Sequence, residues 1–213
     1  MATRETHERL LDIAVEEFGA KGLDGASTRS IAAAAGTAMS SITYHYGGKE
    51  GLYLAAADHI ARRMAEELGP GVALASGALP STAIAARALF HQIIAGFADK
   101  MVSPEIEARS LFIVREQMRP TEAFDRIYGG LLGTMLGQLA ELVCIATGVA
   151  DRYRARLLTV TLIGQVIVMR ASRASCLRLL EREQLDAALV ADLKARIAAN
   201  IDAIFDSIRQ EQP

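Results

Sequence analysis

Apolar residues recur at helical spacing through most of this sequence, and this periodicity restricts the chain to one fold class. The first apolar stripe consists of Leu10, Leu11, Ala14, Val15 and Phe18. Intervals of one and three residues place these side chains on one side of a helix over about residues 4–20. Gly22 can end this helix because glycine adopts a positive φ without a steric penalty. No strand pattern competes, so we expect an all-α protein.

The chain divides into two parts at a segment of different composition. Residues 69–81, GPGVALASGALPS, contain three glycines, two prolines and no charge, which is typical of a loop. We expect an N-terminal domain of residues 1–50 and a second domain of residues 51–213, connected by a fourth helix over 49–67. The helices predicted after the loop lie near 81–101, 104–118, 120–147, 151–174, 175–182 and 186–210.

Composition excludes several classes of protein. The chain is 51% hydrophobic and 23% charged, as soluble globular proteins are. A secretory signal is lacking and no continuous apolar run reaches the roughly 18 residues of a membrane helix, so we expect a cytoplasmic protein without a membrane partner. Cys144 and Cys176 are isolated, which argues against a disulfide framework. The four histidines lack ligand spacing, so we expect no metal and no cofactor.

The segment from Gly25 to Lys49 contains no Asp or Glu, although the chain has a formal net charge of -2. It holds two predicted short helices, 28–35 and 39–45, separated by Gly36. This arrangement is typical of a helix-turn-helix, whose second helix fits the major groove of DNA. Ala32 lies where the helices would cross and only a small side chain fits. The apolar wedge between them would consist of Ile31, Ala35 and Ile42.

The other side chains of the second short helix are too polar and mixed for a core, so we expect them to face outward. Hydroxyl groups and arginine bind phosphates or base edges, and a surface without carboxylates does not repel the DNA backbone. The segments TRSIAAAAG (28–36) and SITYHYGGKEGLY (41–53) resemble the DNA-binding module of the TetR family of transcriptional regulators. The resemblance implies DNA contacts by Thr28, Arg29, Met39, Ser40, Ser41, Thr43, Tyr44, His45 and Lys49.

Particular roles follow from the same resemblance. Thr28 and Lys49 would hold phosphates, and Arg29 would contact a base or a phosphate near the groove edge. His45 would contact DNA, although it could also be an ordinary surface histidine. Tyr46 replaces the usual Phe and is expected in the core. Gly48 stands where the family often has a Ser, Asn or Asp cap, which should weaken the start of the fourth helix slightly.

Two helices of the second part are too apolar to remain exposed in a monomer. The helix 151–174 is apolar on more than one face, and the last helix has a near-heptad apolar seam ending at Ile208. We expect both to pair with a second copy, as the TetR fold implies. This pairing would place the two reading helices, the second helix of each helix-turn-helix, about 34–36 Å apart on a pseudo-palindromic operator. The predicted interface consists of Leu162, Ile163, Val166, Ile167, Arg170, Leu193, Ile197, Ile201 and Ile204.

The second part, especially residues 112–124 and 162–180, resembles the TetR subgroup with a CecR-type C-terminal domain. In the TetR family such helices enclose a pocket whose occupancy changes the spacing of the reading helices. Methionine and aromatic side chains at helical spacing would suit a flat or lipophilic effector, although filling of the core is their commoner role. The candidate lining residues are Phe90, Ile94, Phe97, Phe112, Arg115, Tyr128, Met135, Gln138, Gln165 and Met169.

These patterns predict a homodimeric transcriptional regulator, a repressor that a small-molecule effector releases from its double-stranded DNA operator. One alternative keeps the DNA-binding module but gives the second domain a protein partner instead of a small ligand. Another is a small helical enzyme, against which the sequence shows no nucleophile-base pair, no metal spacing and no phosphate loop. Arg115 and Glu116 could bind a ligand or form a structural ion pair, and we favour structure.

Overall fold

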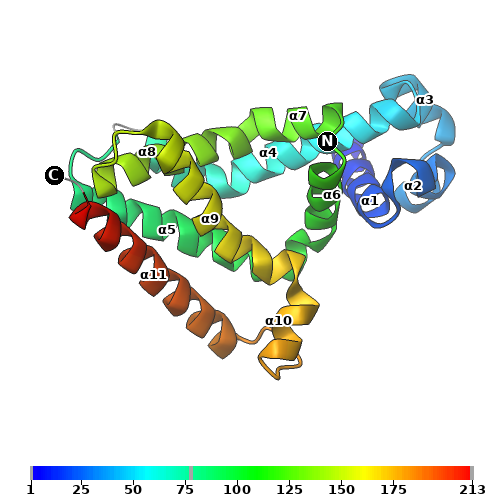
Figure 1. Cartoon of the computed structure of the whole chain (residues 1–213). Coiled ribbons are helices and arrows are strands. Elements are labelled where there is room, and N and C mark those ends of the chain that lie inside the picture. Colours follow the sequence, from blue (N-terminus) through cyan, green and yellow to red (C-terminus); the bar gives the residue numbers. More distant parts are fainter. Residues whose placement is uncertain (1, 77–78, 212–213) are drawn as a thin grey trace. The chain divides into compact units, whose positions relative to one another are not determined.

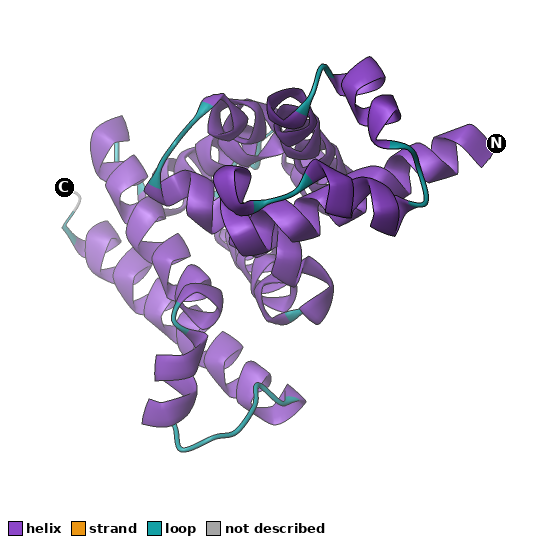
Figure 2. Cartoon of the chain, turned by 90° about the vertical axis from the view of Figure 1, so that its right-hand side faces the viewer, coloured by secondary structure: helices purple, strands orange, loops and turns teal. Residues whose placement is uncertain are grey.

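The computed structural model describes residues 2–76 and 79–211, with side chains for residues 6–67 and 79–211. All regular elements of this described part are helical, which confirms the all-α prediction (Figure 1, Figure 2). They are α1 (Ala2–Gly25), α2 (Thr28–Ala35), α3 (Met39–Tyr46), α4 (Lys49–Ser76), α5 (Ala83–Val102), η1 (Pro104–Ile106), α6 (Glu107–Met118), α7 (Glu122–Ile127), η2 (Tyr128–Leu132), α8 (Gly133–Thr147), α9 (Arg152–Ala171), α10 (Arg173–Leu179) and α11 (Ala187–Gln210).

Glycines in the left-handed region separate the N-terminal helices. Gly36 (φ 66°) ends α2 and Gly47 (φ 74°) ends α3, which confirms the predicted turns. The Ser27 hydroxyl accepts a hydrogen bond from the amide of Ser30 and thereby caps α2. Helix α1 was predicted too short, because the chain turns at Gly22 (φ 74°) and then continues helically to Gly25.

Helix α4 extends through residues that were predicted to be a loop. It continues to Ser76, although Pro70 has no amide hydrogen to donate within it. Alanine and leucine after the proline favour helix, so glycine and proline content misled the prediction for residues 69–76. Residues 77–78 of the predicted loop lie outside the described residues, and residues 79–82 are not helical.

The chain forms two compact units, and each is described by itself. The first comprises Met1–Gly69 with Glu105–Gly133, and the second comprises Pro70–Pro104 with Thr134–Pro213. In the first unit α6 packs on α1 so closely that a Cβ on Gly19 would lie 2.6 Å from the carbonyl oxygen of Ala108. The unit that contains the helix-turn-helix therefore extends beyond residue 50, and the functional boundary at residue 50 stays a prediction.

In the second unit α5 lies alongside both α9 and α11 (Figure 1). Phe90 of α5 meets Phe205 of α11, with 5.2 Å between the ring centroids. Next to this contact, Arg87 donates hydrogen bonds to Asp202 at 2.7 Å and to Asp206 at 2.6 Å. Aromatic packing and ion pairing thus fix α11 against α5.

One helical stretch, Glu122–Thr147, is long and apolar enough by composition to span a membrane. The bent pair formed by α9 and α10 meets the same criteria of length and composition when the two helices are taken together. Core helices of soluble proteins also meet these criteria. The α8 part of the stretch buries Leu139, Leu142 and Val143 in the protein. Packing inside the protein accounts for part of this apolar composition.

Candidate nucleic-acid interface

Helix α3 packs one edge into the core and exposes the rest of its surface. Ile42 is buried with Ile31 and Ala35 of α2, which confirms the predicted apolar wedge. Tyr44 on the opposite side is 84% exposed. Of the other predicted contacts on α3, Ser41 is half-buried, and those that are exposed are Met39, Ser40, Thr43 and His45.

The start of α2 presents the two predicted contacts outside α3. Arg29 is exposed and Thr28 is half-buried. Because Ser27 supplies the helix cap, the hydroxyl of Thr28 is left for another partner. At the other end of α2 the guanidinium of Arg9 donates to the carbonyl oxygen of Ala35 at 2.5 Å. This bond fixes the turn between α2 and α3 to α1.

Lys49 already has one partner within the chain. Its ammonium group donates a hydrogen bond of 2.9 Å to the carbonyl oxygen of Asp24, near the end of α1. An ammonium group has three hydrogens, so this bond leaves two for another acceptor. The phosphate contact predicted for Lys49 stays a prediction, and the bond to Asp24 was not foreseen.

Tyr46 is only partly a core residue. Its ring packs against the core of the first unit but remains half-buried, and its hydroxyl lies 3.0 Å from Nδ1 of His7. Burial raises the pKa of Tyr46 above its usual value. The phenol therefore keeps its proton and can donate a hydrogen bond to the His7 ring.

The surface built from Gly25 to Lys49 is rich in donors and lacks carboxylates. The hydroxyl groups of Ser40, Thr43 and Tyr44 make no hydrogen bond to other residues in the described part of the chain. An exposed helix with uncommitted donors and no negative charge can bind phosphates and base edges. We call this exposed surface of α2 and α3 the donor face.

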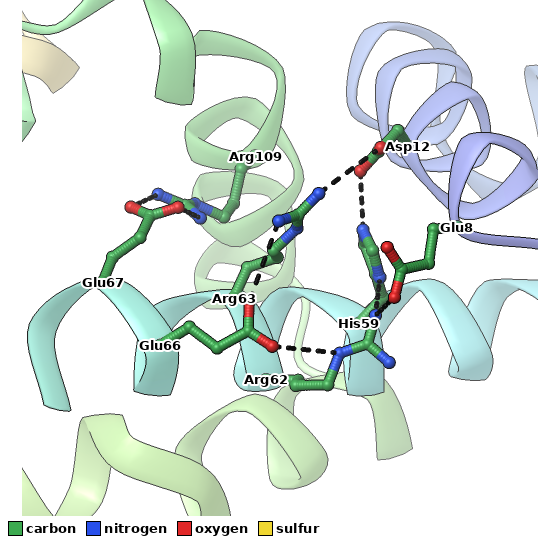
Figure 3. A network of polar contacts seen from close by, with 8 residues as sticks. All are labelled: Glu8, Asp12, His59, Arg62, Arg63, Glu66, Glu67 and Arg109. Atoms are coloured by element: carbon green, nitrogen blue, oxygen red, sulfur yellow. Dashed lines mark hydrogen bonds and ion pairs between the residues drawn. The ribbon is translucent and has the colours of Figure 1, made fainter. Parts of the chain in front are cut away.

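A network of charged side chains joins α1 to α4 and α6 (Figure 3). His59 of α4 is buried, with Nε2 2.6 Å from Asp12 of α1 and Nδ1 2.7 Å from the guanidinium of Arg62. Arg109 of α6 donates two bonds of 2.9 Å to Glu67 of α4. Local sequence patterns do not predict this network, because Asp12 and His59 are 47 residues apart in the chain.

Arg115 and Glu116 have structural roles, but in bonds to different partners rather than in one ion pair. The buried carboxylate of Glu116 accepts a 2.6 Å bond from the hydroxyl of Tyr53 and a 3.0 Å bond from the amide of Thr121 before α7. Burial and the bond to Glu116 both raise the pKa of Tyr53. Arg115 donates to the carbonyl oxygen of Gly19 at 3.4 Å. Both residues thus hold the first unit together.

The candidate pocket residues are divided between the two units. Three of them, Phe112, Arg115 and Tyr128, belong to the first unit. Phe112 is fully buried and stacks on Tyr53 at 4.6 Å, so it fills the core there. Tyr128 is 44% exposed and stacks on Phe124 at 5.8 Å.

The other seven candidates belong to the second unit. Four are buried, namely Phe90, Ile94, Met135 and Met169, and three are half-buried, namely Phe97, Gln138 and Gln165. The Gln165 side chain accepts a 2.9 Å hydrogen bond from Asn200 of α11. Ile94 lines a small cavity of about 30 Å³ with Ile201. A ligand-binding role for these residues stays a prediction.

The predicted dimer interface stays a prediction, but the structure limits the surface that its residues can offer. Five of its residues are buried within a single chain, namely Leu162, Ile163, Val166, Ile197 and Ile201. Such side chains have almost no surface left for a partner. Half-buried are Ile167, Arg170, Leu193 and Ile204. The main apolar stripe of these helices faces the protein's own core.

Comparisons with known proteins agree with the helix-turn-helix geometry. Residues 10–56 match the bacterial regulatory proteins of the tetR family, and residues 86–208 match the C-terminal domain of the HTH-type transcriptional dual regulator CecR. The chain belongs to the TetR family of transcriptional regulators. It is a DNA-binding regulator with a CecR-type C-terminal domain, and the enzymatic alternative is wrong.

Two curated relatives and two solved structures illustrate the match. The TetR-family chain is 30% identical to CecR of Shigella flexneri, over 97% of this chain and 94% of that protein. It is 40% identical to the regulatory protein RaaS of Mycobacterium tuberculosis over 27% of each chain. The fold resembles the regulator SCO4454 of Streptomyces coelicolor (TM-score 0.66, 18% identity, 97% of each chain). It also resembles FadR of Bacillus subtilis in complex with stearoyl-CoA (TM-score 0.63, 17% identity, 92% of this chain and 97% of that chain).

Proposed function

We propose that this TetR-family protein is a cytoplasmic, homodimeric repressor that binds a pseudo-palindromic operator through the donor face and leaves it when a small molecule binds. The single observation that supports DNA contact most directly is the exposure of α3. Its apolar residue Ile42 holds the helix to the core, while Tyr44 and its neighbours face solvent. Donors in this position can enter a major groove without carboxylates that repel phosphate.

A small-molecule effector is supported by the CecR-type C-terminal domain and by the FadR relative whose structure contains stearoyl-CoA. The predicted pocket residues of the second unit are mostly apolar, and Gln138 and Gln165 add polar groups. Such a mixture suits a largely apolar ligand that a few polar contacts orient. We infer an apolar or amphiphilic effector on this basis.

The dimer surface we propose lies on a different side of the predicted helices. On α9 the exposed apolar side chains are Tyr153 (75% exposed), Leu157 (52%), Val160 (68%) and Val168 (41%). On α11 exposed alanines follow at intervals of three and four residues, at Ala188, Ala191, Ala195 and Ala199. Large side chains opposite small ones let two helices approach closely, and contiguous exposed apolar surface marks protein interfaces.

Fluorescence anisotropy with duplexes from the DNA upstream of its own gene tests the function. We expect saturable binding that weakens as salt increases, with one dimer per pseudo-palindromic duplex. Light scattering should give a dimer for the wild type and a monomer for the double variant Leu157→Glu, Val160→Glu, because both side chains are exposed in the single chain. Binding of equal strength to every duplex, or a monomeric wild type, would contradict the proposal.

A further inference from the structure

A hollow of about 430 Å³ lies beside the donor face, between α1 and α3. Its lining consists of Thr6, His7 and Leu10 of α1, Thr37 of the turn, and Ser41, His45 and Tyr46 of α3. All of these residues belong to the first unit, and Ser41 and His45 are themselves predicted DNA contacts. The hollow therefore continues the donor face toward α1.

Hydrogen-bond donors dominate the polar lining of this hollow. Hydroxyl groups come from Thr37, Ser41 and Tyr46, and imidazole rings come from His7 and His45. No carboxylate lines it among the described residues. A second hollow in the same unit, beside the network of Figure 3, is lined by both signs of charge, with the carboxylates of Asp12, Glu16, Glu67 and Glu105 and the guanidinium groups of Arg63 and Arg109. Its carboxylates would repel an anion, whereas the described lining of the first hollow has none.

His7 is held at this site by Tyr46. The two rings stack with 5.5 Å between centroids and an interplanar angle of 17°. The Tyr46 hydroxyl lies 3.0 Å from Nδ1 and 3.4 Å from Nε2 of His7. The raised pKa of Tyr46 keeps its phenol protonated, so the hydroxyl can donate to whichever facing ring nitrogen of His7 carries no proton. An exposed histidine with a fixed orientation loses less conformational freedom when it binds a ligand.

We propose that this hollow binds one phosphodiester group of the DNA backbone, with His7 as a contact that lies outside the helix-turn-helix. The proposal rests on the proposed DNA-binding function. A helix in the major groove has a phosphate backbone along each of its sides, and Ser41 and His45 mark the side of α3 that faces α1. A phosphate there accepts hydrogen bonds from the imidazole of His7 and the hydroxyls of Thr37 and Ser41.

The test compares His7→Ala and Thr37→Ala with the wild type. A duplex is first selected from a random library with the wild-type protein, and affinities are measured for this duplex and for a scrambled one. A hydrogen bond to a charged phosphate contributes strongly to the binding free energy. Each variant should therefore bind both duplexes about tenfold more weakly. A phosphate contact carries no sequence information, so the preference between the duplexes should be unchanged.

Controls separate this inference from the proposed function. Gln92→Ala changes an exposed polar residue of α5 in the other unit and should bind like the wild type. Thermal unfolding identifies variants that fail to fold, and His7→Asp keeps a polar side chain but adds repulsion, so it should bind more weakly than His7→Ala. If the wild type selects a duplex but His7→Ala and Thr37→Ala bind it within about twofold of the wild type, the inference is wrong while the function stands. If the wild type selects none, the function itself fails.

A free phosphate is the other source of the same chemistry. Amide NMR spectra of the full-length protein can be recorded with the selected duplex, and separately with inorganic phosphate at constant ionic strength. Shifts of the Thr37 and Ser41 signals with the duplex support the proposal. Shifts with inorganic phosphate but not with the duplex would assign the hollow to a free anion. Shifts with neither would show that the hollow is not a phosphate-binding site.

Discussion

The donor face and the network of Figure 3 are both polar surfaces of the first unit, yet their side chains have different partners. In the network, His59 bonds to Asp12 and Arg62, and Arg109 bonds to Glu67. On the donor face, from Gly25 to Lys49, there is no carboxylate to pair with. The difference teaches that polar residues paired within the chain hold its helices together, whereas those without internal partners are available to DNA.

The two surfaces also differ in how much they contribute to the free energy of folding. Exposed ion pairs of the network each contribute about 0–1 kcal/mol to folding, but the buried His59 would cost more if it lost its partners. The hydroxyls of the donor face contribute little to folding because water already satisfies them. Substitutions should therefore affect binding on one surface and stability on the other.

A carboxylate placed on the donor face should produce the largest effect. Thr43→Glu puts a negative charge on the exposed side of α3, next to the phosphates of a bound duplex. Like charges at an interface cost several kcal/mol, so affinity should fall about a hundredfold. Anisotropy titration measures the loss. Gln92→Glu, with the same charge change on α5, should bind normally, and an equal loss there would show that net charge alone is responsible.

Removal of the buried histidine should have the next largest effect, on stability rather than on binding. His59→Ala breaks the bonds to Asp12 and Arg62 and should lower the free energy of unfolding by about 2 kcal/mol. Urea unfolding followed by circular dichroism measures this change. Arg63→Ala, which removes a more exposed partner of Asp12, should cost less than about 1 kcal/mol. Equal losses would contradict the importance of the buried imidazole.

Truncation of single predicted DNA contacts, on the donor face and at Lys49 beside it, should have moderate effects. Tyr44→Ala should weaken operator binding about tenfold and leave dimerisation intact, because the ring is exposed. Lys49→Ala should also lower the slope of log affinity against log salt by about one per protomer, since one cation is lost. Titrations at several salt concentrations measure both the loss of affinity and the change in slope. An unchanged slope would mean that Lys49 serves only its bond to Asp24.

The smallest effect should be on the pH dependence of stability. It comes from the ion pairs of the second unit, whose carboxylates are paired like those of the network but are partly exposed. Burial opposes ionisation of Asp202, but hydrogen bonds from His91 and Arg87 outweigh it and lower the pKa of that carboxyl. Its stabilisation is therefore present above the unfolded-state pKa of about 3.9 and is lost as pH falls through the lower folded-state pKa. The difference in unfolding free energy between wild type and Arg87→Met should shrink below pH 4. A difference that persisted would exclude this linkage.

Local patterns predicted most of the fold and pointed to the donor face as the candidate DNA-binding site. Helical spacing located the helices, and Gly36 and Gly47 located the turns, because both effects depend on a few neighbouring residues. The absence of carboxylates from 25–49 identified the donor face without any tertiary information. The loop expected at 69–76 was wrong, since glycine and proline lower helix propensity but do not exclude a helix.

The pocket and dimer predictions show where periodicity is insufficient. Leu162 and Leu157 are both apolar residues of α9, yet the first is fully buried and the second is 52% exposed. Their spacing places them on different sides of the helix, but only the packing against α5 and α11 determines which side faces the core. Phe112 is a candidate pocket residue by its spacing, and the packing of the first unit buries it against Tyr53.

The sequence by itself determined that this chain is helical, that it contains a helix-turn-helix, and that one of its surfaces has no carboxylate. These properties depend on side-chain periodicity, glycine conformation and residue type within short segments. Only the tertiary structure decided that His59 meets Asp12, that Glu116 accepts a bond from Tyr53, and that His7 lies beside α3. Such contacts join residues far apart in the chain, and their partners are set by the packing of whole helices.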